Sequence, residues 1–244
     1  MTEIPSPDDS SRTAPPQADA RTRVIEALMV LAAGREFEEI TLTDICHEAG
    51  VSLSQFRDLF PSKGAVLGAL SRKFDKAVLD GTSDDLLGES SKERLFDVLM
   101  RRLDAMAPYK AGLEGVTRWA RREPLAAAPL NTVMLNSMRF MLEAAGIESE
   151  GGVGLLKLQG LVLAWTRILD VWFTDDEPGL SKTMAALDRE LERGGRVVAR
   201  LGDLDRMTAP LQRIAGSLLN IPRNFGAGFR GAPRREDETD LETT

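Results

Sequence analysis

Few side chains in this sequence could carry out catalysis or bind a metal ion. The single histidine, His47, follows the single cysteine, Cys46, and neither belongs to a cluster with the three or four ligands of a zinc site. No serine stands in the glycine pattern of a nucleophile elbow. The glycines from Gly151 to Gly154 lack the Lys-Ser/Thr pair of a phosphate-binding loop. We therefore predict that the chain is not an enzyme and uses no cofactor and no metal.

A second set of polar side chains has the spacing of two helix starts. Thr41 is followed three residues later by Asp44, and Ser52 is followed three residues later by Gln55. Each pair has the pattern of a capping box, in which the two side chains bond to each other's backbone amides. Gly50 stands between them, where the chain must reverse and a positive φ is favoured. The pattern predicts a helix-turn-helix, whose second helix enters the major groove of DNA.

Two longer helices are predicted to flank these short ones. The first begins near Arg21 and ends near Gly34, and the second spans residues 63–80 behind a cap at Ser62. Apolar residues recur every three or four positions in both segments. The side chains predicted to face inward are Val24, Ile25, Leu28, Leu31 and Ala32 in the first and Val66, Leu67, Leu70, Phe74, Ala77 and Val78 in the second.

Beyond a polar linker, residues 81–91, the helical period continues. No stretch alternates between apolar and polar residues as a strand does. We predict one helix that ends near Pro108 and further helices at residues 109–122, 129–145, 153–174 and 180–201. Their inward residues include Leu95, Val98, Leu99, Leu103 and Met106, and in the last helix Met184, Leu187, Leu191 and Val198. The predicted fold is all-α, with a three-helix helix-turn-helix domain followed by a larger helical bundle.

The most apolar window, residues 154–173, is predicted to be a buried helix rather than a membrane span. Lys157, Arg167 and Asp170 interrupt it and would be costly in lipid. The first residues show no basic region followed by an apolar run, so no signal peptide is expected. One cysteine allows no intrachain disulfide, which fits a reducing compartment. We therefore predict a cytoplasmic protein.

Composition divides the chain into five predicted regions: a disordered arm at 1–20, a helix-turn-helix domain at 21–81, a helical bundle at 91–202, a basic amphipathic tail at 206–235 and an acidic disordered tail at 236–244. The formal net charge is −7, and residues 21–80 hold eight Lys/Arg against nine Asp/Glu. The helix-turn-helix domain is therefore not a basic block, and only a few of its cations could contact phosphates.

The sequence of residues 23–70 resembles that of the amino-terminal domain of the tetracycline-repressor (TetR) family of transcriptional regulators. The resemblance is carried by Ala32, Gly34 and Phe37, by Thr41-Leu42-Thr43-Asp44-Ile45, by Ala49-Gly50-Val51-Ser52, and by Phe60-Pro61-Ser62-Lys63 with Leu67. It implies a homodimeric regulator that binds double-stranded DNA, often as a repressor. It also implies that residues 91–202 dimerise and hold a small apolar effector.

The resemblance implies a DNA-binding surface on both sides of the turn. Thr41, Ser52 and Lys63 match positions that contact the DNA backbone, and residues 53–57 match the base-reading surface. Hydroxyl groups at helix starts can hold a phosphate. Arg57 can pair with guanine or a phosphate, while Gln55 can pair with adenine or be used by the cap. The candidate DNA-binding residues are Thr41, Thr43, Ser52, Leu53, Ser54, Gln55, Arg57 and Lys63.

The bundle contains large, soft side chains of the kind that line apolar pockets. Plain core packing is the alternative for each of them. The candidate pocket residues are Trp119, Met134, Met138, Trp165, Leu169 and Trp172.

Residues 95–194 also resemble the carboxy-terminal domain of the lipid-binding accessory protein of ubiquinone biosynthesis. This resemblance is carried by Ala107-Pro108-Tyr109, Ala144-Ala145-Gly146, residues 157–172, and Ala186-Leu187-Asp188-Arg189 with Glu192. It implies an alternative function, a non-enzymatic isoprenoid-lipid-binding protein acting at the membrane surface. An apolar helical face flanked by arginines suits anionic lipid, although a docked helix or a disordered tail is equally compatible. The candidate membrane-contact residues are Leu211, Ile214, Leu218 and Leu219.

Overall fold

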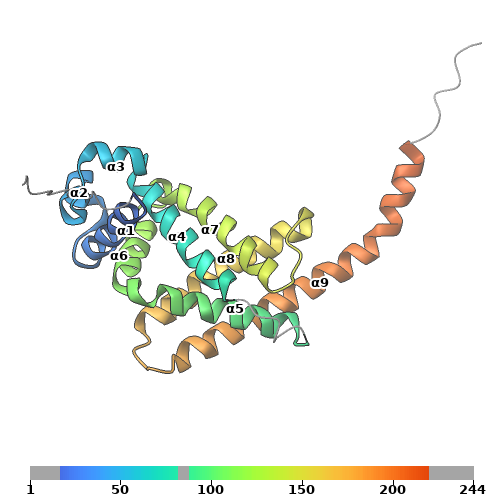
Figure 1. Ribbon diagram of the computed structural model, residues 1–244. Helices are drawn as coiled ribbons and strands as arrows, with labels where there is room; N and C mark the ends of the chain where they lie inside the picture. The colour runs from blue at the N-terminus through green and yellow to red at the C-terminus, as the bar shows by residue number, and fades with distance from the viewer. Residues whose placement is uncertain (1–16, 82–87, 220–244) are drawn as a thin grey trace, which may run out of the picture. The chain divides into compact units, whose positions relative to one another are not determined.

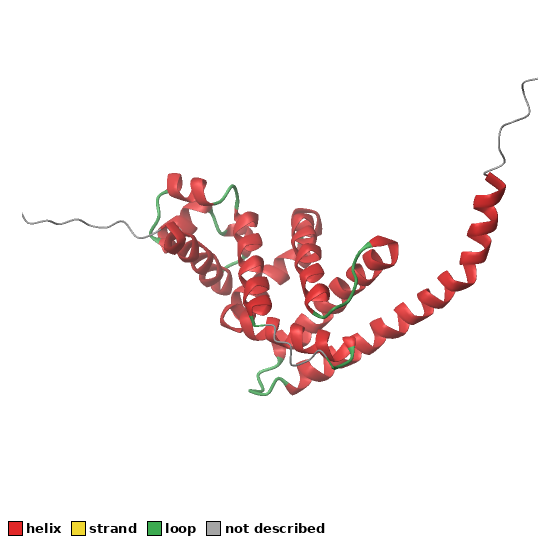
Figure 2. Cartoon of the chain, turned by 45° about the vertical axis from the view of Figure 1, so that its right-hand side comes forward, coloured by secondary structure: helices red, strands yellow, loops and turns green. Residues whose placement is uncertain are grey.

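The computed structural model describes the backbone of residues 17–81 and 88–219, and the side chains of residues 20–81 and 88–200. Every regular element in these residues is a helix, which confirms the predicted all-α class (Figures 1 and 2). The elements are α1 (Gln17–Gly34), η1 (Phe37–Glu39), α2 (Leu42–Ala49), α3 (Leu53–Leu59), α4 (Lys63–Asp80), α5 (Ser91–Met106), η3 (Ala107–Tyr109), α6 (Lys110–Arg122), α7 (Pro124–Ala144), α8 (Gly151–Thr174) and α9 (Ser181–Leu219). The chain divides into two units, Met1–Arg200 and Leu201–Thr244.

The helices that flank the turn end where the sequence predicts, and the second also begins there. The first begins at Gln17, four residues before its predicted start near Arg21 and inside the predicted disordered arm at 1–20, so that boundary was wrong. α1 ends at Gly34, and α4 starts after Ser62, whose side chain accepts a hydrogen bond from the backbone amide of Ala65. Their inward faces are largely as expected, with two differences. Leu31 is only half-buried, and Ala77 is exposed. The helical period of apolar residues identifies which face of a helix is buried. How much of a residue at the edge of that face is buried depends on how far the neighbouring helices extend over it.

α5 and α7 supply much of the core of the bundle. The five apolar side chains predicted to face inward from α5 are all buried. A further capping box, formed by Ser90 and Glu93, starts this helix and was not predicted. α7 begins at Pro124, five residues before the predicted start at Pro129, so that prediction was wrong. Pro124 suits the first helical position, where no amide partner is needed, and Pro129 lies inside the helix.

α8 lies in the core, as predicted for the apolar window. Nine of its residues are buried, including Trp165, Ile168 and Trp172. By length and composition it is also the one described helix that could cross a membrane, with a mean hydropathy of 1.3. Core helices of bundles share these two properties, because both environments exclude water.

α9 continues well beyond its predicted end at Leu201. Within Ser181–Arg200, Leu187 and Leu191 are buried as predicted, but Met184 is 40% exposed, which corrects its predicted inward position. Val198 is half-buried. The membrane-contact candidates fall in the later part of α9, whose side chains lie outside the described residues: Leu211, Ile214, Leu218 and Leu219.

α1 and α6 make an unusually close helix crossing, and this crossing attaches the helix-turn-helix to the bundle. A Cβ atom added at Gly112 of α6 would lie 2.5 Å from the carbonyl oxygen of Met29. One added at Gly115 would lie still closer to the carbonyl oxygen of Ala32. Glycine is therefore required at both positions for the backbones to approach this closely. The buried apolar residues of α1–α4 and of the bundle form one continuous core.

Candidate nucleic-acid interface

The turn between α2 and α3 is built by the two predicted capping boxes. The Thr41 hydroxyl accepts the Asp44 amide at 3.1 Å, and the Asp44 carboxylate accepts the Thr41 amide at 2.9 Å. The Ser52 hydroxyl accepts a hydrogen bond from the backbone amide of Gln55 at 3.1 Å, and the Gln55 side-chain oxygen accepts one from the backbone amide of Ser52 at 2.9 Å. Gly50 has a φ of 61°, the left-handed value expected of it. Both helix starts are thus determined by bonds between residues three apart.

The carboxylate of Asp44 is stabilised in its charged form. Hydrogen bonds from the backbone amide and hydroxyl of Thr41 hold its pKa below the usual value, and Arg35 at 3.3 Å adds a favourable charge interaction. The first capping box therefore carries a negative charge at neutral pH.

The inner side of α3 is anchored by aromatic residues. Phe56 and Phe60 are buried, with ring centroids 6.0 Å apart. Cys46 of α2 is also buried, and burial raises the pKa of its thiol, whereas His47 is exposed. These contacts leave the opposite side of the motif uncovered by the rest of the described chain. The exposed candidates are Thr41, Thr43, Ser52, Leu53, Ser54, Gln55 and Arg57.

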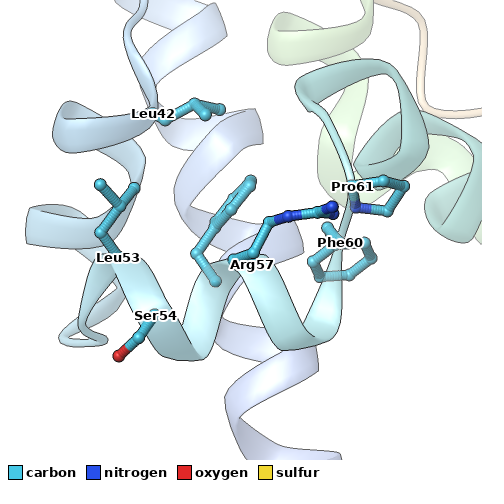
Figure 3. A pocket seen from close by; sticks show the side chains of 7 residues that line it. Leu42, Leu53, Ser54, Arg57, Phe60 and Pro61 are labelled. Atoms are coloured by element: carbon cyan, nitrogen blue, oxygen red, sulfur yellow. The ribbon is translucent and has the colours of Figure 1, made fainter.

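A hollow of about 440 Å³ lies beside α3 (Figure 3). Its lining is mostly apolar, with one hydroxyl and one guanidinium. The lining residues are Leu42, Leu53, Ser54, Phe56, Arg57, Phe60 and Pro61. Four of these, Leu42, Phe56, Phe60 and Pro61, were not among the predicted site residues. The period of α3 could have placed Phe56 and Phe60 underneath, but the position of Pro61 depends on how the chain turns into α4.

Lys63 does not project freely from the surface. Its ammonium group donates to the carbonyl oxygens of Phe37 at 2.5 Å and Ile40 at 2.9 Å, and lies 4.3 Å from the centroid of the Phe37 ring. Burial lowers the pKa of this amine, and the negative charge of Glu38 opposes that effect. The predicted contact with a phosphate would require Lys63 to give up or share these bonds.

Two arginines of α1 also bond to backbone carbonyls of the motif. Arg23 donates to the carbonyl of Ala49 at 2.9 Å, and Arg21 donates to the carbonyl of Leu59 at 3.1 Å. These carbonyls end α2 and α3, where helices leave acceptors unpaired. Arg57, by contrast, forms no hydrogen bond or ion pair with any residue that the structure describes. It is exposed and free to contact a partner.

The candidate pocket residues are spread through the bundle. Trp119 of α6 is half-buried and packs on Phe37, with ring centroids 4.6 Å apart. Met134 is half-buried, whereas the other four are buried in the core: Met138, Trp165, Leu169 and Trp172. Trp119 therefore also belongs to the contact between the helix-turn-helix and α6.

A buried polar cluster lies among these apolar residues and was not predicted. Arg102 of α5 donates to the Asp75 carboxylate of α4 at 2.5 Å, and Ser137 of α7 donates to the same oxygen at 2.5 Å. Burial lowers the pKa of Arg102, and Asp75 opposes this effect. Arg102 Nε and the indole nitrogen of Trp165 are buried without a hydrogen-bond partner in the described part of the chain. Arg102 lies on the same face of α5 as the buried apolar residues. Its position in the helical period could therefore have predicted that this arginine is buried.

Comparison with known proteins identifies the fold. No protein-family model matches the sequence, and no curated protein matches it. The structure is similar to that of a TetR transcriptional regulator from Rhodococcus sp. RHA1, with a TM-score of 0.56 and 22% identity over 73% of this chain and 96% of that one. It is also similar to the TetR transcriptional regulator from Nitrosomonas europaea ATCC 19718, with a TM-score of 0.57 and 21% identity over 72% of this chain and 97% of that one. The chain thus has the fold of TetR transcriptional regulators, as the sequence resemblance implies.

Proposed function

We propose that this chain is a cytoplasmic, DNA-binding transcriptional regulator that places α3 in the major groove of a duplex. The observation that carries the proposal is the exposed outer face of α3. Leu53 and Arg57 are exposed on it, while Phe56 fastens the helix to the core from below. A short helix held rigidly at a surface by its caps and its inner face is what major-groove recognition needs.

Selection from a random duplex library with the purified full chain tests this proposal. Enriched duplexes share a sequence, and their affinity falls as salt rises, because counterions are released from the phosphates that the protein contacts. A library that stays unenriched at low salt contradicts the proposal.

Arg57→Ala is expected to weaken binding to the selected duplex by roughly tenfold or more, the usual worth of a bidentate arginine–guanine contact. Sequence preference at one base pair relaxes with it. The melting temperature stays unchanged, because Arg57 has no bond to lose among the described residues. Affinity measured by fluorescence anisotropy provides the test. Arg189→Ala on the exposed surface of α9 removes the same charge and serves as the control; equal losses in both variants would indicate a nonspecific charge effect.

The homodimer expected of this fold is proposed to form through the outer face of α8. Leu156, Gly160 and Leu163 have i, i+4, i+7 spacing and therefore share one side of the helix. Leu156 and Leu163 are 54% and 57% exposed, and no atom would lie within 4 Å of a Cβ at Gly160. An apolar face of this kind is suited to pairing with a second copy.

Leu163→Glu is expected to convert the dimer to a monomer, because the interface would then bury two unpaired carboxylates. Sedimentation would give a mass near the 26.7 kDa of one chain instead of twice that value. Leu125→Glu introduces the same charge at a side chain that is 91% exposed on α7 and should leave the mass unchanged. A wild-type chain that sediments as a monomer contradicts the assignment.

The bundle is proposed to hold a small, mainly apolar effector near α5 and α8. The unpaired donors of Arg102 and Trp165 support an effector that also carries an oxygen acceptor. Organic extraction of the purified protein, followed by mass spectrometry, identifies what it carries. An isoprenoid lipid in the extract, together with no duplex binding, would instead support the alternative of an accessory protein for ubiquinone biosynthesis.

A further inference from the structure

Resting on the proposed function, we propose that Leu53 reads a thymine through its C5-methyl group, with the methyl seated in the hollow beside α3. Arg57 then pairs with a guanine close to it. The DNA sequence is thus recognised by one apolar contact from Leu53 and one charged contact from Arg57, rather than by the side-chain amide of Gln55.

The polar side chains of the first turn of α3 are already used inside the protein. The Gln55 side-chain oxygen accepts the Ser52 amide at 2.9 Å. A glutamine that reads adenine needs both its oxygen and its nitrogen for the bidentate pair, and here the oxygen is occupied. The Ser54 hydroxyl lies 2.9 Å from the Ser52 hydroxyl, within hydrogen-bonding distance. The Ser52 hydroxyl also accepts a hydrogen bond from the backbone amide of Gln55. Breaking these bonds for a base would loosen the helix start that positions the surface.

The groups left for a base are apolar. Leu53 is 57% exposed and Leu42 is 38% exposed, and both line the hollow with Pro61 (Figure 3). Leu53 is the first residue of the recognition helix, and residues at that end contact base edges in helix-turn-helix proteins. In the major groove, the thymine methyl is the apolar group that a base presents. Burial of that methyl against Leu53 removes apolar surface from water on both molecules.

Arg57 completes the surface at the rim of the hollow. Figure 3 shows its side chain extending beside Pro61 and Phe60. Its guanidinium has no partner in the described residues, and its donor fork matches guanine O6 and N7. Leu53 and Arg57 are four residues apart and so lie on the same side of α3. They can therefore reach neighbouring base pairs in one groove.

Removal of single methyl groups from the selected duplex tests the inference. Each thymine is replaced in turn by deoxyuridine, and affinity is measured for the full wild-type chain and for Leu53→Ala. At one thymine of each half-site, wild type should lose about fourfold in affinity, the worth of one buried methyl group. Leu53→Ala should bind the thymine and deoxyuridine duplexes equally. Gln55→Glu keeps a side-chain oxygen for the Ser52 amide but lacks the nitrogen that an adenine pair needs, so it should show the same preference as wild type at every adenine.

The outcomes separate this inference from the proposed function. An enriched duplex at which every deoxyuridine is neutral overturns the thymine contact while leaving the regulator intact. The same holds if Leu53→Ala retains the full methyl effect, or if Gln55→Glu loses a preference for adenine that wild type shows. A library without enrichment overturns both proposals. Because Leu53 is exposed, circular dichroism of Leu53→Ala should match that of wild type.

Discussion

Gly115→Ala is expected to destabilise the protein by about 3 kcal/mol or more, the upper end of the cost of overpacking a core. The new methyl group would collide with the backbone carbonyl of Ala32 in α1, which cannot rotate away as a side chain can. α1 would have to separate from α6, and the nearby contact of Gly112 with Met29 would be lost as well. The gain from better helix propensity, up to about 1 kcal/mol, is too small to compensate.

Urea unfolding monitored by circular dichroism measures this effect. Gly194→Ala in α9 is the matched control, because no atom would lie within 4 Å of its Cβ. This variant should be as stable as wild type or slightly more stable. Equal stability of the two variants would show that the α1–α6 crossing is looser than the structure indicates.

The second large effect is expected at the buried ion pair. Asp75→Ala should cost about 3–5 kcal/mol, because it leaves the charge of Arg102 buried and uncompensated. Arg102 is almost completely buried, and Asp75 is its ion-pair partner. Ser137 also loses the acceptor of its hydroxyl. Guanidinium unfolding, followed by the fluorescence of the three tryptophans, measures the loss; one of them, Trp165, lies next to Arg102.

The double variant Asp75→Leu, Arg102→Leu separates an unpaired charge from lost packing. Replacement of both partners by apolar side chains should recover much of the stability, since the desolvation cost of the pair disappears with the charges. A double variant that is less stable than Asp75→Ala would show that the pair itself stabilises the fold. Effector retention by the double variant then tests whether Arg102 contributes to binding.

The sequence alone predicted neither the close α1–α6 crossing nor the buried ion pair. The helical period correctly predicted the inward stripe of α5, and Arg102 stands on that stripe next to Leu103. Nothing in the period indicated that Asp75, 27 residues earlier, would lie opposite it. The same limitation applied to Gly112 and Gly115, because a glycine in a helix does not identify the helix that packs on it.

Lys63 illustrates the same limit within the candidate interface. Its place in the Phe-Pro-Ser-Lys segment implied a phosphate contact, yet its ammonium bonds to carbonyls at Phe37 and Ile40, 26 and 23 residues away. Arg21 and Arg23 likewise bond to the ends of α3 and α2. A sequence shows how many cations a region holds but not which of them its own carbonyls engage.

The sequence by itself determined the helix-turn-helix, because the bonds that start α2 and α3 join residues only three apart. Gly50 sets the reversal between them through its own backbone preference. Such features depend on nearest neighbours, which the order of residues specifies directly. Only the tertiary structure decided that Arg57 has no partner among the described residues and that a hollow lies between Leu53 and Pro61. Each of these depends on which exposed groups the rest of the chain leaves uncovered, and that follows from packing between helices distant in sequence.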